Sequence, residues 1–394
     1  MYPLIKREDD NDELNQPRHA CTPTIKRDRE DDNEPPQLKW KKVKKEAKTE
    51  ELQPKWKVEK QEDKDFLCLK DILPSPTLEK STLVPNSRVF ADLVAMLKGL
   101  LPLLSPDFTL PTKADQTLPN HDITPAEKER ILHNAFLAHV YKESDKLLPF
   151  RTSAASQKRI LAPGGPYDPQ HLQTKAGLFS ALIYRGITYH TQFLINNKTV
   201  FQDLDDWKKT LKEAHNYAHR KDKKYFCRMD AYGSAAKARQ VGNATGYWQL
   251  VSTDTDFTAW LTSEKKISAV DLFRKIEKAC YGFGSLTTYF IVMDYVESGL
   301  TEPVTLDDIA KFISMLRMGG KTGLAALGYK VKNSAQIHQA FTSLHAALSE
   351  ALSADEQRRM NFGPILIEFS LCKLGRMKET FRAWRQAATQ LALG

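Results

Sequence analysis

The same helix-start signal occurs at four places in this 394-residue chain. In each case a Ser or Thr is followed three residues later by Asp or Glu, and an amphipathic run begins there; the pairs are Thr124 with Glu127, Ser268 with Asp271, Thr305 with Asp308, and Ser353 with Glu356. Such pairs satisfy backbone N–H groups of a first helical turn, so they start helices rather than strands. The signal therefore predicts a mainly α fold.

Two other segments refine this prediction. The densely charged run 205–225 has its few apolar residues at helical spacing, which predicts a further helix with one narrow apolar stripe. Segment 186–200 instead has aromatic and β-branched residues on both sides of a possible turn, Asn196-Asn197. That pattern predicts a small β-hairpin added to the α fold.

The N-terminal segment has a different composition from the rest of the chain. Residues 1–64 contain 16 basic and 16 acidic side chains, so half of them are charged and their net charge is zero. Such a segment buries too little apolar surface to offset the entropy lost on ordering, and we expect residues 1–85 to form a long disordered tail. A basic cluster in it is either a nuclear localisation signal or a solvated charge run; its lysines are Lys39, Lys41, Lys42, Lys44 and Lys45.

The other 330 residues contain 42 basic and 33 acidic side chains, and they therefore carry the whole net charge of +9. A basic folded part indicates a polyanionic partner, nucleic acid before a membrane surface. The most apolar run, 93–104, is interrupted by Lys98 and Pro102 and is shorter than the ~20 residues that cross a bilayer. The N-terminus has no apolar signal region, so we expect a soluble protein without membrane contact.

Patterns typical of enzymes and metal proteins are weak in this sequence. The five cysteines are scattered without a CxxC pair, which favours neither a disulfide framework nor a zinc site. The stretch Gly319–Gly323 has Met315 where a P-loop needs its first glycine, and it follows a predicted helix instead of a strand. His215 and His219 share a helix face, but no third ligand is evident. We therefore expect neither an enzyme nor a protein that needs a metal or cofactor.

A glycine-rich stretch, 231–248, predicts a flexible connection between two helical lobes. We place an N-terminal lobe at 86–250, a C-terminal lobe at 251–377 and a C-terminal arm at 378–394. These boundaries are expectations from composition and length.

Basic side chains recur beside glycines, where the backbone can approach a phosphate closely. Lys237 and Arg239 lie on the glycine-rich connection, and Lys321 follows Gly319-Gly320. Three more candidates from the C-terminal part are Arg317, Lys330 and Lys332. If they converge between the lobes, they form a basic groove that can follow a single-stranded phosphate backbone without reading sequence. Ordinary surface charge is the alternative.

Several C-terminal segments carry a resemblance to a known family. They are Asp254–Phe257, the capped helix Asp271–Cys280, the run YGFGSLTTYF at 281–290, the run GLTEPV at 299–304, and FGPILIEFSLCK at 362–373. Together they cover about a third of the chain and resemble nucleoproteins of non-segmented negative-strand RNA viruses, such as bornaviruses, paramyxoviruses and plant rhabdoviruses. Many members of that family have their charged tail at the other end of the chain.

The resemblance implies two helical lobes closing on a basic groove, and terminal arms that exchange between neighbouring copies along genomic RNA. It also implies that Lys373 and Arg376 face RNA, because they lie in or just after a stretch similar to the family's RNA-facing segment. The implied partners are single-stranded RNA, further copies of the chain, and a viral phosphoprotein or polymerase. The implied locations are the virion, the host cytoplasm and the host nucleus.

Two other functions fit the same sequence features. The coat protein of a filamentous plant virus would also be α-rich and basic. A cellular nuclear adaptor or scaffold protein would use the charged tail for partner binding and would package no RNA.

Overall fold

The computed structural model describes residues 87–216, 225–226, 239–316, 319–377 and 379–393. All of these belong to one compact unit, Thr77–Gly394. The predicted tail and its lysine cluster lie outside the described residues.

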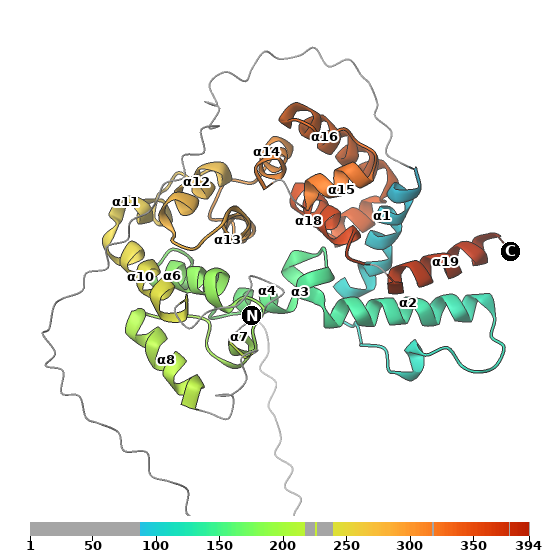
Figure 1. The fold of residues 1–394 in the computed structure, drawn as a ribbon, viewed down its shortest axis with the longest axis horizontal. Coiled ribbons are helices and arrows are strands. Elements are labelled where there is room, and N and C mark those ends of the chain that lie inside the picture. Colours follow the sequence, from blue (N-terminus) through green and yellow to red (C-terminus); the bar gives the residue numbers. More distant parts are fainter. Residues whose placement is uncertain (1–86, 217–224, 227–238, 317–318, 378, 394) are drawn as a thin grey trace, which may run out of the picture. The chain divides into compact units, whose positions relative to one another are not determined.

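Almost every described element is a helix (Figure 1). The α-helices up to residue 216 are α1 (Ser87–Leu100), α2 (Pro125–Lys142), α3 (Ser144–Leu147), α4 (Ala155–Leu161), α5 (Pro169–Leu172), α6 (Lys175–Ile183), α7 (Gln192–Asn196) and α8 (Leu204–Asn216). Those after residue 243 are α10 (Ala244–Thr253), α11 (Thr255–Thr258), α12 (Ala269–Ala279), α13 (Ser285–Glu297), α14 (Leu306–Leu316), α15 (Gly320–Ala326), α16 (Ser334–Ala351), α17 (Ala354–Arg359), α18 (Pro364–Leu374) and α19 (Glu379–Leu393).

Short helical turns complete the architecture. The 3-10 turns are η1 (Leu101–Leu104), η2 (Ala114–Gln116), η3 (Arg151–Ser153) and η7 (Ala259–Leu261), and the π-helical turns are η4 (Tyr184–Thr188) and η6 (Arg239–Asn243). Across the part of the chain that the structure describes, the only extended pairing is an isolated bridge between Ile267 and Thr301. The prediction of a mainly α fold is confirmed.

The four predicted helix starts are present as hydrogen-bonded caps. The side chains of Thr124 and Ser268 accept from the backbone N–H groups of the third residue along, at the starts of α2 and α12. Ser353 makes a reciprocal capping box with Glu356 before α17. The corresponding pair before α14 is also reciprocal, because the Asp308 N–H donates to the Thr305 hydroxyl and the Thr305 N–H donates to Asp308.

The predicted β-hairpin at 186–200 is wrong. Its first residues continue α6 as the π-helical turn η4, and the next form α7. The Thr191 hydroxyl accepts from the Leu194 N–H at 3.2 Å and so starts this short helix. Phe193 is buried against Trp207, with ring centroids 5.5 Å apart, so packing in three dimensions overrides the local β preference.

The predicted flexible connection at 231–248 is helical over its described part. Residues 239–253 form η6 and α10 without interruption, and Gly242 and Gly246 both lie within these helices. α10 packs against α6, and Gly186 of η4 leaves the space that the Tyr247 ring of α10 occupies. The predicted lobe boundary at residue 250 falls inside α10, and the division into two lobes stays a prediction.

The C-terminal helix α19 packs along α2, as Figure 1 shows, and also contacts α1. Its anchor is Trp384, which stacks on His133 and on Phe136 of α2 with ring centroids 4.5 and 5.3 Å away. Gly99 of α1 faces the same indole, and any Cβ at that position would collide with it. The predicted C-terminal arm is thus docked on helices from the start of the described chain.

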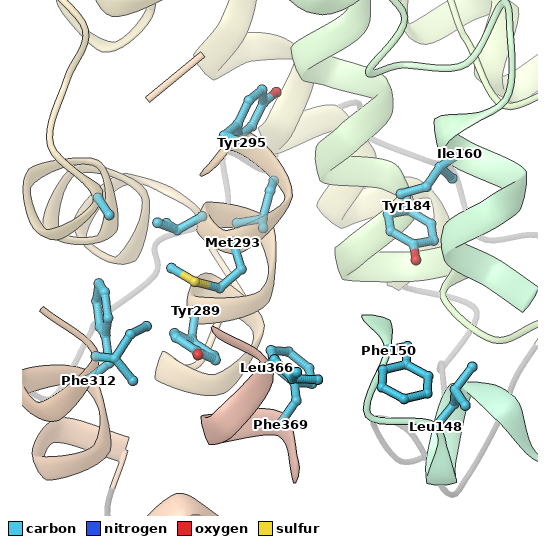
Figure 2. Packing of buried hydrophobic residues seen from close by; sticks show 14 of the residues in the cluster. Leu148, Phe150, Ile160, Tyr184, Tyr289, Met293, Tyr295, Phe312, Leu366 and Phe369 are labelled. Carbon is cyan, nitrogen blue, oxygen red and sulfur yellow. The ribbon is translucent and has the colours of Figure 1, made fainter. Parts of the chain in front are cut away.

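Buried apolar residues form one continuous cluster through the described residues. Figure 2 shows part of it, with Tyr289 and Met293 of α13 and Phe369 of α18 across from Phe150 and Tyr184. The polar cluster described next lies within this apolar surrounding.

Candidate functional site

A single buried carboxylate, Asp294 of α13, gathers side chains from four other segments. It is fully buried and accepts from the Gln157 amide at 2.6 Å and from the Tyr167 hydroxyl at 3.0 Å. Arg185 donates two hydrogen bonds to it, from Nε to Oδ2 at 2.5 Å and from Nη2 to Oδ1 at 2.6 Å. Arg151 Nη2 donates to the same Oδ1. We call Asp294, Arg151, Gln157, Tyr167 and Arg185 the Asp294 cluster.

The two arginines of the cluster have further contacts. Arg151 pairs with Glu297 at the end of α13, with Nε and Oε2 3.3 Å apart. Two cations therefore face two carboxylates. Burial raises the pKa of Glu297, while Arg151 opposes that shift. Burial also lowers the pKa of Arg151, although a guanidinium stays charged in proteins.

Aromatic rings cover the guanidinium faces. The Arg151 guanidinium lies 5.3 Å from the Phe369 ring centroid, and that of Arg185 lies 4.5 Å from Tyr184 and 5.5 Å from Phe290. Cation–π contacts of this kind stabilise an arginine that has lost its water. The same geometry is suited to holding anionic groups, because a stacked guanidinium presents its N–H groups in one plane.

A small cavity adjoins the cluster, with room for about one water molecule (about 30 Å³). Its lining includes the cluster members Arg151, Gln157 and Arg185, the aromatic residues Tyr189, Phe290 and Phe369, and Asp145 and Lys373. Asp294 is not among the lining residues. The cavity therefore brings together a polar, cationic wall and an aromatic wall.

Lys373 of α18 is only 7% exposed, and its contact with RNA stays a prediction. Its Nζ donates to the backbone carbonyls of Asp145 at 3.4 Å and Lys146 at 2.9 Å. Burial, with a smaller contribution from the Arg376 charge, lowers the pKa of Lys373 to about 8. The charge of Lys373 is thus held at the cavity wall at neutral pH.

Two other predicted residues, Arg376 and Lys321, lie on or beside the segments that surround the carboxyl end of α18. Arg376 follows the helix, is exposed, and is close enough to act electrostatically on Lys373. Lys321 is half-buried in α15, whose glycines pack directly on α18. A Cβ at Gly323 would lie 2.6 Å from the Leu371 Cβ, and one at Gly319, whose φ is +57°, would collide with the Cys372 sulfur. The glycines that resemble a P-loop therefore serve helix packing.

Of the remaining candidates, two are described with their side chains. Lys330 and Lys332 are exposed on the connection between α15 and α16. Arg239 belongs to η6, and its side chain is outside the described atoms, as are Lys237, Arg317 and the five tail lysines. Among the described candidates, Arg376 lies near Lys373, and the helix α15 that carries Lys321 packs on α18.

Arg151 and Arg185 were missed by the sequence reasoning, although a signal for two cluster members was present. Asp294 interrupts the apolar run Tyr289–Val296, and Arg185 directly follows the apolar run Leu178–Tyr184. A lone charge within or at the end of an apolar run predicts a buried charge, and a buried charge needs a partner. Pairing these two positions would have pointed to the cluster.

No known family, curated protein or solved structure matches this chain. The described helices include none long and apolar enough to span a membrane. Across the same residues, no group of His, Cys, Asp and Glu side chains has the arrangement of a metal site.

Proposed function

We propose that this protein is a nucleoprotein that binds single-stranded RNA without sequence preference and assembles along it. The observation that carries the proposal is Lys373 at the wall of the cavity that Arg151 and Arg185 also line, with Arg376 close enough to act electrostatically on it at the carboxyl end of α18.

The chemistry of this region suits a phosphate backbone. Lys373, Arg376 and Lys321 supply positive charge for phosphates. Proteins that bind single strands irrespective of sequence follow the backbone with such positive charge. The excess of nine positive charges outside residues 1–64 adds a long-range attraction for any RNA.

Self-assembly is the second part of the proposal, and α19 supports it. This helix is attached to the rest of the chain by the short segment after α18, and it docks mainly on α2 through Trp384. The Trp384 indole N–H donates to Glu129 of α2 at 2.5 Å, and Arg385 pairs with Asp92 of α1 at 3.3 Å. A helix held by one such contact surface can dock on a second copy of the chain instead.

The test of RNA binding compares two double variants with the wild-type chain. Lys321→Ala with Arg376→Ala removes two charges near the end of α18, and Lys209→Ala with Lys212→Ala removes two exposed charges from α8 as the matched control. Fluorescence anisotropy with a labelled oligouridylate is measured over a series of salt concentrations. The slope of log affinity against log salt should become shallower by about 0.7 for each phosphate that the protein no longer neutralises, in the first variant only.

Electron microscopy of the purified protein tests assembly and separates the rival functions. Rings or filaments that contain RNA support the nucleoprotein, whereas a monomer free of nucleic acid supports the adaptor.

In the anisotropy experiment, equal effects of the two double variants on RNA affinity would remove the α18 region from the proposal.

A further inference from the structure

Glu368 of α18 is another buried carboxyl group, and it is only 3% exposed. Both of its oxygens accept hydrogen bonds: Oε2 accepts from the Tyr289 hydroxyl and Oε1 from the Cys372 thiol, each at 3.0 Å. The Tyr289 ring packs near Phe312 and Phe369, with ring centroids 5.3 and 6.2 Å away (Figure 2). Glu368 therefore lies in largely apolar surroundings with a phenol and a thiol as its hydrogen-bond donors.

Unlike Asp294, Glu368 makes no ion pair with another described residue. The cations that act on it from farther away are Lys373 and Arg151, and both are engaged elsewhere. Lys373 donates to two backbone carbonyls, and Arg151 is bound by Asp294 and Glu297. Because a buried carboxylate without a cation at contact distance is costly, burial raises the pKa of Glu368.

The first turn of α15 covers this carboxyl group with its backbone. A Cβ at Gly320 would lie 3.4 Å from Glu368 Oε1, and one at Gly319 would collide with the Cys372 sulfur. The helix then continues along α18, where Gly323 meets Leu371. Because the glycines have no side chains, α15 lies directly over the carboxyl oxygen and the thiol.

We propose that Glu368 is a proton-dependent latch for α15: the neutral carboxyl group lets α15 dock on α18, and the ionised group favours an undocked α15. An ionised Glu368 costs free energy in the docked form, because it is buried and unpaired, and undocking lets water hydrate the charge. The proton that Glu368 releases passes to solvent. The latch goes beyond the proposed function, because it acts on the helix that carries Lys321 whether or not RNA is bound.

The sign of the pH dependence follows from where the proton is held. A hydrated Glu368 has the ordinary pKa of 4.5, and the docked form has a higher one, so the undocked form holds fewer protons above pH 4.5. Rising pH therefore favours undocking, by at most about tenfold per pH unit, until Glu368 also ionises in the docked form.

The other titratable and charged groups around Glu368 do not reproduce this behaviour. Burial raises the pKa values of Tyr289 and Cys372, so both keep their protons. Arg151 stays charged. Burial lowers the pKa of Lys373 to about 8, so rising pH favours its buried form, which is the opposite sign.

The experiment measures hydrogen exchange of the full-length chain by mass spectrometry between about pH 5 and pH 9, with rates corrected for the intrinsic effect of pH. In the wild type, protection of α15 should fall with rising pH by up to about tenfold per unit, relative to α16. Glu368→Gln keeps the side-chain shape without a titrating group, and its α15 protection should not depend on pH. Glu350→Gln, at an exposed position of α16, is the matched control and should behave as the wild type does.

A second variant decides the question if Glu368→Gln does not fold. Tyr289→Phe removes a hydrogen bond that lowers the pKa of Glu368, so the fall in α15 protection should extend to higher pH than in the wild type. The same pH range in Tyr289→Phe as in the wild type would overturn the inference.

A purely structural role for Glu368 gives a different result. In that case Glu368→Gln would lower the unfolding temperature while its α15 protection kept the pH dependence of the wild type, and the inference would be overturned. Wild-type α15 protection that does not change with pH would overturn it as well. Neither outcome depends on RNA, so the proposed function is tested separately.

Discussion

The Asp294 cluster and the carboxyl end of α18 use the same basic residue types under opposite conditions. Arg151 and Arg185 are buried and held by carboxylates, whereas Arg376 is exposed and forms no ion pair with another described residue. A buried charge is bound mainly to its own protein, because removing it from water is costly unless it is paired. An exposed charge contributes little to stability and remains available to a ligand. The cluster should therefore govern folding, and the helix end should govern binding.

The largest effect expected is on the stability of the cluster. Arg185→Ala leaves Asp294 buried with its main cation removed, which should lower the free energy of unfolding by about 3–5 kcal/mol. Denaturant unfolding followed by circular dichroism measures this change. Arg376→Ala is the control, with an expected change within about 0.5 kcal/mol. Equal changes in the free energy of unfolding for the two substitutions would show that the two regions do not differ in their contribution to stability.

Trp384→Ala tests the docking of α19, which depends on packing instead of charge. The substitution empties the space between His133, Phe136 and Gly99 and should lower the free energy of unfolding by about 3 kcal/mol. Size-exclusion chromatography with light scattering should also show loss of assemblies in the presence of RNA. Leu393→Ala, at an 84% exposed position of the same helix, serves as its control. Assemblies that survive Trp384→Ala would show that α19 does not join the copies.

Lys373 shares one property with each region. It is buried at the cavity wall, as the cluster arginines are, and its charge is not fully compensated, as at the exposed helix end. Its pKa falls from the usual 10.5 to about 8, so between these pH values the unfolded chain holds a proton that the folded chain has released. Stability attributable to this group should therefore rise by about 2–3 kcal/mol as pH increases from 8 to 10.5. Lys373→Met should flatten that rise, measured as the difference between the two proteins in denaturant unfolding. A rise of equal size in both proteins would mean that other groups produce it.

The smallest expected effect is on the stability of a variant that lacks both Lys321 and Arg376. Lys321→Ala with Arg376→Ala should change the free energy of unfolding by no more than about 0.5 kcal/mol per site, because neither side chain fills the core. Thermal unfolding measures this, and the anisotropy salt series supplies the binding result for the same protein. A strongly destabilised double variant would assign Lys321, which is half-buried, a packing role.

Local sequence signals determined the helical character of this protein. The capping pairs at Thr124, Ser268, Thr305 and Ser353 predict helices correctly, because a cap involves groups only three residues apart and needs no tertiary context. The charged run 205–225 likewise gives a helix, α8, over its described part up to Asn216.

Only the tertiary structure decided which charges are buried and which elements meet. Asp294 lies 109 residues from Arg185 and 143 from Arg151, and no local pattern specifies that these three side chains come together. The same holds for the failed hairpin at 186–200, where burial of Phe193 against Trp207 outweighed β preference, and for Lys373, whose burial no local pattern specifies. Helix starts depend on neighbouring residues, but burial depends on the whole packed chain, and for this reason the sequence predicted the elements better than the site.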